Sequence, residues 1–200
     1  MKRIVAVLVL GILVTASSFA QIELGVKGGI NLANMSGSGA PPNTKTLAGF
    51  AGGGYLEISL PFLLTIQPEV LYSQKGFISE ETLLGTNIKI TGRLNYLEIP
   101  VLVKYSFPVP VVKPSVYAGP AVGILLSAKA TAEAAGQSAE TDIKDQTTST
   151  DWGLVVGASA HIAVVTLDVR YTLGLTTADK TGSTKSYNRV LTVMLGFPFM

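Results

Sequence analysis

Residues 95–107 read Asn-Tyr-Leu-Glu-Ile-Pro-Val-Leu-Val-Lys-Tyr-Ser-Phe, and both charged side chains, Glu98 and Lys104, fall on even-numbered positions. The odd-numbered positions from Leu97 to Tyr105 are all apolar or aromatic. A β-strand sends alternate side chains to opposite faces, so one face of this segment is apolar and the other carries ionised groups. The pattern favours a strand in a wall that has lipid outside and a polar interior.

The same alternation recurs along the chain and predicts eight strands. We expect them near residues 22–33, 47–59, 62–74, 90–107, 113–128, 151–162, 165–175 and 187–199. Short connections (59–61, 108–110 and the region of Ala163) alternate with long polar ones (34–46, 74–89, 129–150 and 176–186). This rhythm is typical of an up-and-down barrel with tight turns at one end and long loops at the other.

The predicted fold is therefore all-β: an eight-stranded antiparallel transmembrane β-barrel with short periplasmic turns and four long extracellular loops. Residues 21–200 form this single domain, with both termini periplasmic. One alternative is that Trp152 to Leu167 forms a helix, because the turn expected there has no Gly, Pro or Asn at its centre. A soluble lipocalin-like barrel is a second alternative, and it would face its apolar side chains inward.

The first twenty residues predict a cleaved signal peptide. Lys2 and Arg3 form a basic start, Ile4 to Val14 an apolar core, and Ser18-Phe19-Ala20 a small-x-small cleavage site. The whole chain has 15 basic and 13 acidic residues, and removal of Lys2 and Arg3 makes the two numbers equal. The mature chain then has no net charge and no basic patch of the kind that nucleic acid binding requires.

Overall composition narrows the class further. Charged residues make up only 14% of the chain, and there is no cysteine, which excludes disulfides and thiolate metal sites. No segment of the mature sequence reaches the roughly 18 apolar residues that predict a membrane-spanning helix.

The polar faces of the predicted strands carry nearly equal numbers of acidic and basic side chains. The set consists of Glu23, Lys27, Glu57, Glu69, Glu98, Lys104, Lys113, Asp168 and Arg170. An eight-stranded barrel has room inside for side chains but not for a wide channel, and buried charges must pair. We interpret the set as a structural salt-bridge network that fills the interior; an ion or proton pathway is the alternative.

Aromatic residues predict two belts at the membrane interfaces. Phe50, Tyr72, Trp152 and Tyr187 lie at the loop ends of their strands, and Phe62, Tyr105, Phe107, Phe197 and Phe199 at the turn ends. Ten tilted strand residues, as from Phe62 to Tyr72, cover about 25 Å, the height of the apolar band of an outer-membrane barrel.

Several segments resemble the outer-membrane β-barrel domain of PorT-like proteins, a family abundant in the Bacteroidetes lineage. They are Gly25-Val-Lys-Gly-Gly-Ile-Asn, Gln67-Pro-Glu-Val-Leu-Tyr-Ser-Gln-Lys-Gly, Leu97-Glu-Ile-Pro-Val-Leu-Val-Lys-Tyr, Tyr117-Ala-Gly-Pro and Leu167-Asp-Val-Arg-Tyr-Thr-Leu-Gly-Leu. The resemblance implies an outer-membrane barrel whose partners are outer-membrane lipid and the barrel assembly machinery. The PorT name comes from a secretion system.

Residues that could carry chemistry are few. The single histidine, His161, is expected at the tight-turn rim, away from the loop rim where a barrel hydrolase would need it beside a serine or an acid. We predict no catalytic residues, no cofactor and no metal site.

Three function classes follow from these observations. The first is a non-enzymatic surface protein, structural or binding, that acts on an envelope protein or an extracellular ligand through its long loops. The second is an accessory barrel of a secretion or transport machine, which would show a partner patch on the turn rim or the lipid face. The third is a lipid-modifying barrel enzyme, which requires a catalytic cluster.

Overall fold

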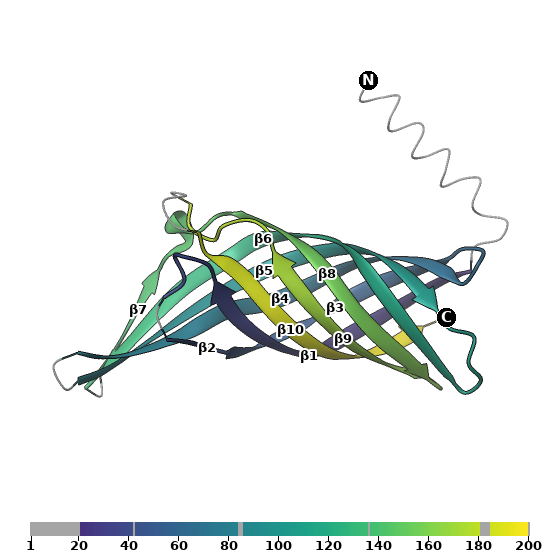
Figure 1. The fold of residues 1–200 in the computed structure, drawn as a ribbon, viewed down its shortest axis with the longest axis horizontal. Coiled ribbons are helices and arrows are strands. Elements are labelled where there is room, and N and C mark those ends of the chain that lie inside the picture. Colours follow the sequence, from purple (N-terminus) through teal and green to yellow (C-terminus); the bar gives the residue numbers. More distant parts are fainter. Residues whose placement is uncertain (1–20, 42, 84–85, 136, 181–184, 200) are drawn as a thin grey trace, which may run out of the picture.

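The computed structural model describes residues 21–41, 43–83, 86–135, 137–180 and 185–199. Their architecture is a closed ring of eight antiparallel strands (Figure 1). The ring strands are β1 (Ile22–Ser36), β3 (Leu47–Ser59), β4 (Leu64–Leu83), β5 (Thr86–Ser106), β6 (Val112–Ala134), β8 (Thr150–Ile162), β9 (Val165–Gly174) and β10 (Tyr187–Phe199). Three short elements lie outside it: β2 (Thr44–Lys45), β7 (Gln137–Asp142) and the 3-10 turn η2 (Lys144–Gln146).

Each ring strand pairs with the strands that precede and follow it, and β10 closes the ring against β1. The closing register runs from Leu24 opposite Phe199 to Ser36 opposite Tyr187. Residues 152–167 form two strands, β8 and β9, with Ile162 opposite Val165, so a helix over this segment is excluded. The predicted eight-stranded barrel is confirmed.

Polar side chains occupy the inside of the barrel and apolar ones the outside. In β4, Thr65, Gln67 and Glu69 are buried, whereas Val70 is 52% exposed. This distribution is the reverse of the one that a lipocalin-like barrel requires. Among the residues that the structure describes, no helix has the length and hydropathy needed to cross a membrane.

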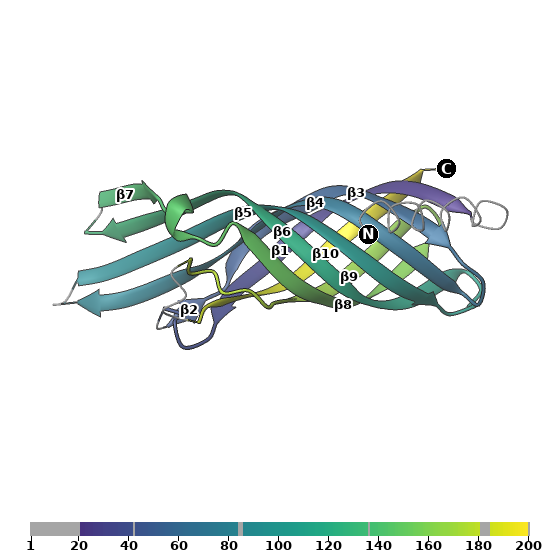
Figure 2. The ribbon, with the colours of Figure 1, turned by 90° about the horizontal axis from the view of Figure 1, so that it is seen from above.

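Two of the four expected loops are strands instead. The polarity of segments 74–89 and 129–150 predicts loops, but β4 and β5 continue as a hairpin to residues 83 and 86, and β6 continues to Ala134 and pairs with β7. The hairpins lie side by side and extend beyond the ring (Figures 1 and 2). We call residues 77–83, 86–94, 128–134 and 137–142 the projecting sheet. The end of the barrel that carries it is the hairpin end, and the opposite end is the turn end.

The other two long connections fold across the hairpin end. The first contacts the second through a hydrogen bond from the Gly39 amide to the Lys185 carbonyl, at 3.0 Å. Beneath them lies an apolar cap, which consists of the buried side chains Met35, Leu94, Tyr96, Leu125 and Ala128, with Ala40, Phe77, Ile143 and Ala178 packed against it. The described parts of these two loops therefore pack over this end of the barrel.

The aromatic residues lie on the outer surface, with two exceptions to the predicted strand positions, Phe62 and Phe107. Phe50 and Trp152, at 54% and 56% exposed, lie toward the hairpin end, and Phe197 and Phe199, at 46% and 52%, toward the turn end. Tyr72, Tyr105 and Tyr187 likewise lie on the outer face of their strands, whereas Phe107 follows Ser106, the last residue of β5, and is exposed. Phe62 is expected inside a strand, but β4 begins only at Leu64, and Phe62 lies in the preceding turn with φ 64°. The predicted signal peptide, residues 1–20, lies outside the described residues.

Candidate functional site

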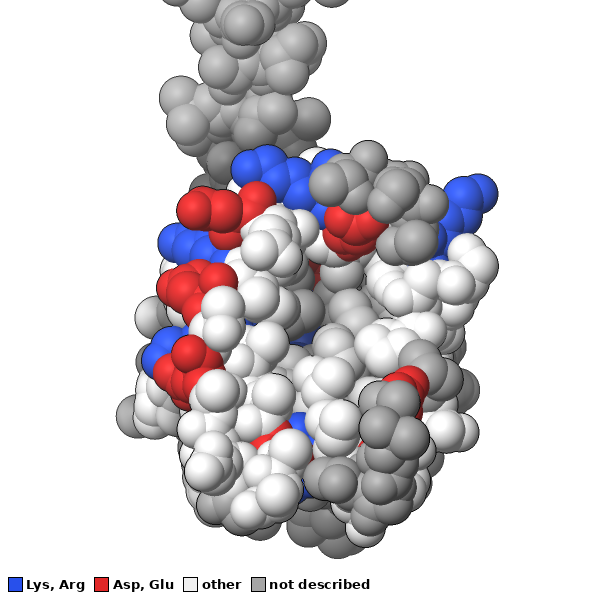
Figure 3. All heavy atoms as spheres, turned by 90° about the vertical axis from the view of Figure 1, so that its left-hand side faces the viewer, with Lys and Arg blue, Asp and Glu red and all other residues white. Residues whose placement is uncertain are grey.

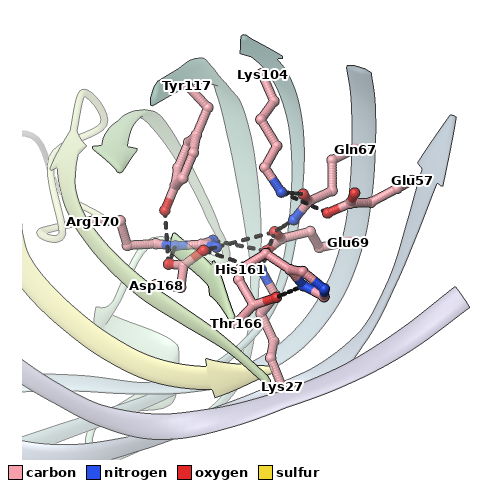
Figure 4. Close-up of polar contacts among 10 residues, drawn as sticks. All are labelled: Lys27, Glu57, Gln67, Glu69, Lys104, Tyr117, His161, Thr166, Asp168 and Arg170. Atoms are coloured by element: carbon pink, nitrogen blue, oxygen red, sulfur yellow. Dashed lines mark hydrogen bonds and ion pairs between the residues drawn. The ribbon is translucent and has the colours of Figure 1, made fainter. Parts of the chain in front are cut away.

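A central cluster of four charged side chains spans the interior of the barrel. Strand β1 contributes Lys27, β4 contributes Glu69, and β9 contributes Asp168 and Arg170 (Figure 4). Lys27 Nζ lies 2.8 Å from Glu69 Oε1 and 3.3 Å from Asp168 Oδ2. Two acids face two bases, so the cluster is neutral.

Arg170 holds both acids of the central cluster at once. Its Nη1 and Nη2 donate to the two oxygens of Glu69 at 2.7 and 3.1 Å, and its Nε and Nη2 donate to those of Asp168 at 2.9 and 3.0 Å. Tyr117 donates a further hydrogen bond to Asp168 Oδ1 at 2.7 Å. The planar fork of donors is the geometry that makes Arg–carboxylate pairs strong and directional. The cluster therefore ties β1, β4, β6 and β9 together across the bore.

Tyrosine rings cover the cations, and glycines make room for the rings. Lys27 Nζ lies 4.8 Å from the centroid of the Tyr55 ring, and a methyl group at Gly25, opposite Tyr55, would overlap that ring. Gly157 opposite Tyr117 repeats the arrangement beneath Arg170. A cation over an aromatic face is stabilised by the ring quadrupole, more so where water is excluded. These glycines are therefore required by the interior packing.

A second ion pair lies between the central cluster and the turn end. Lys104 Nζ donates to Glu57 Oε1 at 2.6 Å and to Gln67 Oε1 at 3.1 Å. The amide nitrogen of Gln67 in turn donates to Glu69, which connects this pair to the central cluster. Figure 4 shows the two groups side by side inside the barrel.

A third cluster lies toward the hairpin end, and two of its members are absent from the predicted set. Lys75 Nζ lies 3.3 Å from Glu98 Oε2 and 3.5 Å from Asp151 Oδ2, and Asn188 donates to that same Asp151 oxygen at 2.9 Å. Lys75 falls in an expected loop because its surroundings in the sequence are polar, and Asp151 stands at the very start of its strand. Both residues have the odd numbers of the inward-facing side chains of their strands, and this alternation is the signal that could have identified them as interior charges.

The structure brings seven of the nine predicted interior charges into ion pairs. They are Lys27, Glu57, Glu69, Glu98, Lys104, Asp168 and Arg170. Glu23 and Lys113 instead line a cavity at the turn end. Lys113 lies at the mouth of the barrel, because β6 begins at Val112, and its side chain is exposed.

Paired and buried charges of this kind are suited to fixing the strands rather than to chemistry. Among the described residues, no group of three or more His, Cys, Asp or Glu side chains could hold a metal ion. His161 lies at the turn end, where its Nδ1 is 3.0 Å from Oγ1 of Thr166 on the neighbouring strand. The predicted rim position of His161 agrees with this geometry.

Comparison of the sequence with protein families identifies the same fold. The family model described as "Outer membrane protein beta-barrel domain" matches residues 17–180. The chain belongs to this family. It is therefore an outer-membrane β-barrel protein. Comparison with curated protein sequences gives no significant match.

Similar solved structures come from several bacteria, all at low sequence identity. Ail, the attachment invasion locus protein of Yersinia pestis, is 16% identical, covers 88% of this chain and 98% of its own, and has a TM-score of 0.46. Neisserial surface protein A is also 16% identical, with 90% and 99% covered and a TM-score of 0.46. A major outer membrane protein from Thermus thermophilus is 11% identical, with 90% and 100% covered and a TM-score of 0.47.

Proposed function

We propose that this outer-membrane barrel is a non-enzymatic, non-conducting scaffold that presents the projecting sheet outside the cell as a binding surface for a polypeptide ligand. The observation that carries the proposal is that the strands β4 to β7 continue as an ordered sheet beyond a barrel whose interior is filled. We also propose that the chain is a PorT-like member of its family, on the strength of the segments quoted above.

The filled interior supports a scaffold rather than a pore. The apolar cap, the cluster around Lys75 and the central cluster around Arg170 follow one another along the bore. The side chain of Glu69 is completely buried and that of Arg170 is 3% exposed. Substrate could not pass without breaking these contacts, and breaking a buried ion pair costs several kcal/mol.

The two faces of the projecting sheet differ in chemistry. One face carries the cross-strand ion pairs Lys89–Glu133 and Lys129–Glu140, and Glu80 on the same face pairs with Lys45 of the adjoining β2. Charged side chains gather along one side of the hairpin end (Figure 3). The other face carries a row in which Ile90 lies opposite Ala132 and Ala132 opposite Ala139. Ile90 is 41% exposed, so this small-residue apolar face is open to contact.

The edge of the projecting sheet offers backbone pairing as well. All six residues of β7 are exposed, and within the described part of the chain β7 pairs only with β6. An unpaired edge strand presents a row of N–H and C=O groups that an extended peptide can join, while a neighbouring apolar face selects its side chains. These two features together favour a polypeptide as the ligand.

The proposed orientation places the projecting sheet outside the cell and the turns and both termini in the periplasm, as long strands and short turns are distributed in barrels of this kind. Cysteine labelling tests it, because the chain has no cysteine of its own. A membrane-impermeant maleimide should label Ser138→Cys in intact cells, and Val111→Cys only after the outer membrane is opened. The reverse pattern would contradict the orientation.

Binding can be tested with a random peptide library displayed on phage and the purified protein in lipid nanodiscs. Selected peptides should lose about tenfold or more in affinity for Ala139→Lys, because a lysine on the edge strand opposes strand addition. Lys129→Gln, on the charged face, is the matched control and should bind as the wild type does. If every peptide selected on the wild type bound Ala139→Lys equally well, the projecting sheet would not be the binding surface.

A further inference from the structure

The three short turns of the barrel are tipped with exposed apolar side chains. Phe62 and Leu63 lie in the β3–β4 turn, Val109 and Val111 in the β5–β6 turn, and Val164 in the β8–β9 turn. Their exposed fractions are 89%, 45%, 47%, 88% and 70%, respectively. We call these five residues the apolar crown. Exposed apolar side chains that gather at one end of a molecule are a candidate site of interaction.

The backbone conformation of the turns is unfavourable for bulky apolar residues, so stability of the fold does not explain their presence. Phe62, Leu63 and Val111 have φ values of 64°, 62° and 74°, in the left-handed region. Glycine or asparagine is favoured there, and a bulky or β-branched residue is strained. Glycine or asparagine at these positions would relieve the backbone strain. Strained backbone of this kind is typical of functional sites.

The apolar crown borders a cavity of mixed polarity at the turn end. The cavity has a volume of about 460 Å³, and its lining includes Leu63 and Val109 of the crown together with Glu57, Lys104 and Lys113. Hydroxyl groups contribute much of the remaining wall, among them Ser106 and Ser115, whose oxygens lie 2.9 Å apart. We call it the vestibule. Its charges are of both signs, which suits a ligand that has both hydrogen-bond donors and acceptors.

The position of the crown favours a polypeptide over bilayer lipid or a second copy of the chain. Bilayer lipid reaches the outer side of the turns, but Leu63 and Val109 line the bore, where a bilayer does not extend. A second copy in the same membrane has its turn end facing the same way, so two crowns lie beside each other and never meet end to end. An extended polypeptide satisfies both parts, because its apolar side chains fit the crown while its backbone satisfies the polar wall of the vestibule.

We propose that the turn end is a docking site for an extended segment of another envelope protein, which packs on the apolar crown and enters the vestibule. This site is independent of the projecting sheet at the opposite end. It is also the patch on the turn rim that an accessory barrel of a secretion or transport machine would require.

The first test uses the crown variant Phe62→Asn/Val111→Asn/Val164→Ser. Asparagine tolerates the left-handed backbone, so this variant should fold and keep its heat-modifiable migration in detergent gels. Peptides from a random phage-displayed library are selected on Ala139→Lys in nanodiscs, so that the projecting sheet does not capture them. They should bind the wild type equally and the crown variant about tenfold or more weakly. Peptides that bind the crown variant as tightly as the wild type would overturn the proposal.

A second test identifies the occupant in cells. A photoreactive amino acid is placed at Phe62 or Val111, and at Trp152 in the lipid-facing belt as the control. We expect protease-sensitive adducts at 62 and 111 that mass spectrometry maps to one extended segment with apolar side chains, and only lipid adducts at 152. Lipid adducts alone at all three positions would overturn the proposal in favour of a membrane contact.

Discussion

Arg170 is the residue on which the interior of the barrel most depends. It donates to Glu69 and Asp168 at once, while Lys27 pairs with both acids from the other side and the neutral donors Gln67 and Tyr117 each reach one of them. In a site where water is excluded, an acid that loses its partner keeps the full desolvation penalty. The arrangement of the two carboxylates in the central cluster therefore depends mainly on the guanidinium group of Arg170.

We predict that Arg170→Met lowers the free energy of unfolding by about 3–5 kcal/mol, because it leaves two buried carboxylates with a single lysine. Urea unfolding in lipid vesicles measures this change. Lys89→Met is the matched control: it removes an exposed ion pair with Glu133, 3.4 Å long, and should cost about 1 kcal/mol or less. Equal effects of the two substitutions would show that the cluster is not structural.

A second prediction at the scale of single residues concerns Gly25. A methyl group there overlaps the Tyr55 ring, so Gly25→Ala should cost about 1–3 kcal/mol through overpacking. The same substitution in a Tyr55→Leu background should cost much less, because the ring is gone. A double-mutant cycle measures the coupling, and additive effects would contradict the proposed contact.

At the scale of elements, the projecting sheet and the barrel differ in what stabilises them. The barrel strands are linked by buried ion pairs across the bore, whereas the projecting sheet carries exposed pairs such as Lys89–Glu133. Exposed pairs contribute little to stability, and ends of hairpins open locally without unfolding the rest. The sheet should thus be separable from the barrel.

Shortening the first hairpin tests this separation. Ser79 lies opposite Ile90, so an Asn-Gly turn can join them and replace residues 80–89. We expect the shortened protein to keep its heat-modifiable migration and to change its free energy of unfolding by no more than about 1 kcal/mol. Loss of folding would show that the hairpin is part of the barrel's stabilising structure.

At the scale of the whole molecule, the bore is blocked in successive layers from the apolar cap to the Lys104–Glu57 pair. We therefore predict no defined conductance in planar lipid bilayers. Met35→Ser/Leu94→Ser, which alters only the apolar cap, should also remain closed, because the charged clusters beneath it still fill the bore. A steady ohmic conductance of the wild type would contradict a filled interior.

Alternation along each strand is a local property, and it was sufficient to predict the eight strands, the polar interior and most of its charges. Glu98 and Lys104 of the segment 95–107 could be placed inside from parity alone. The same local reasoning failed at Lys75, because a polar alternating segment in water has the composition of a loop. It also could not show that much of the polar segments 74–89 and 129–150 forms strands that pair with one another.

Only the tertiary structure decided which charges meet. Glu69 and Arg170 are 101 residues apart, and Glu98 pairs with Lys75 rather than with Lys104 on its own strand. Closure of the ring and the stagger between its strands set these partners, and both depend on pairing across the whole sheet. The sequence by itself determined the faces of the strands. The apolar cap, the vestibule and the apolar crown arise only when the ring closes, since each is assembled from segments far apart in the chain.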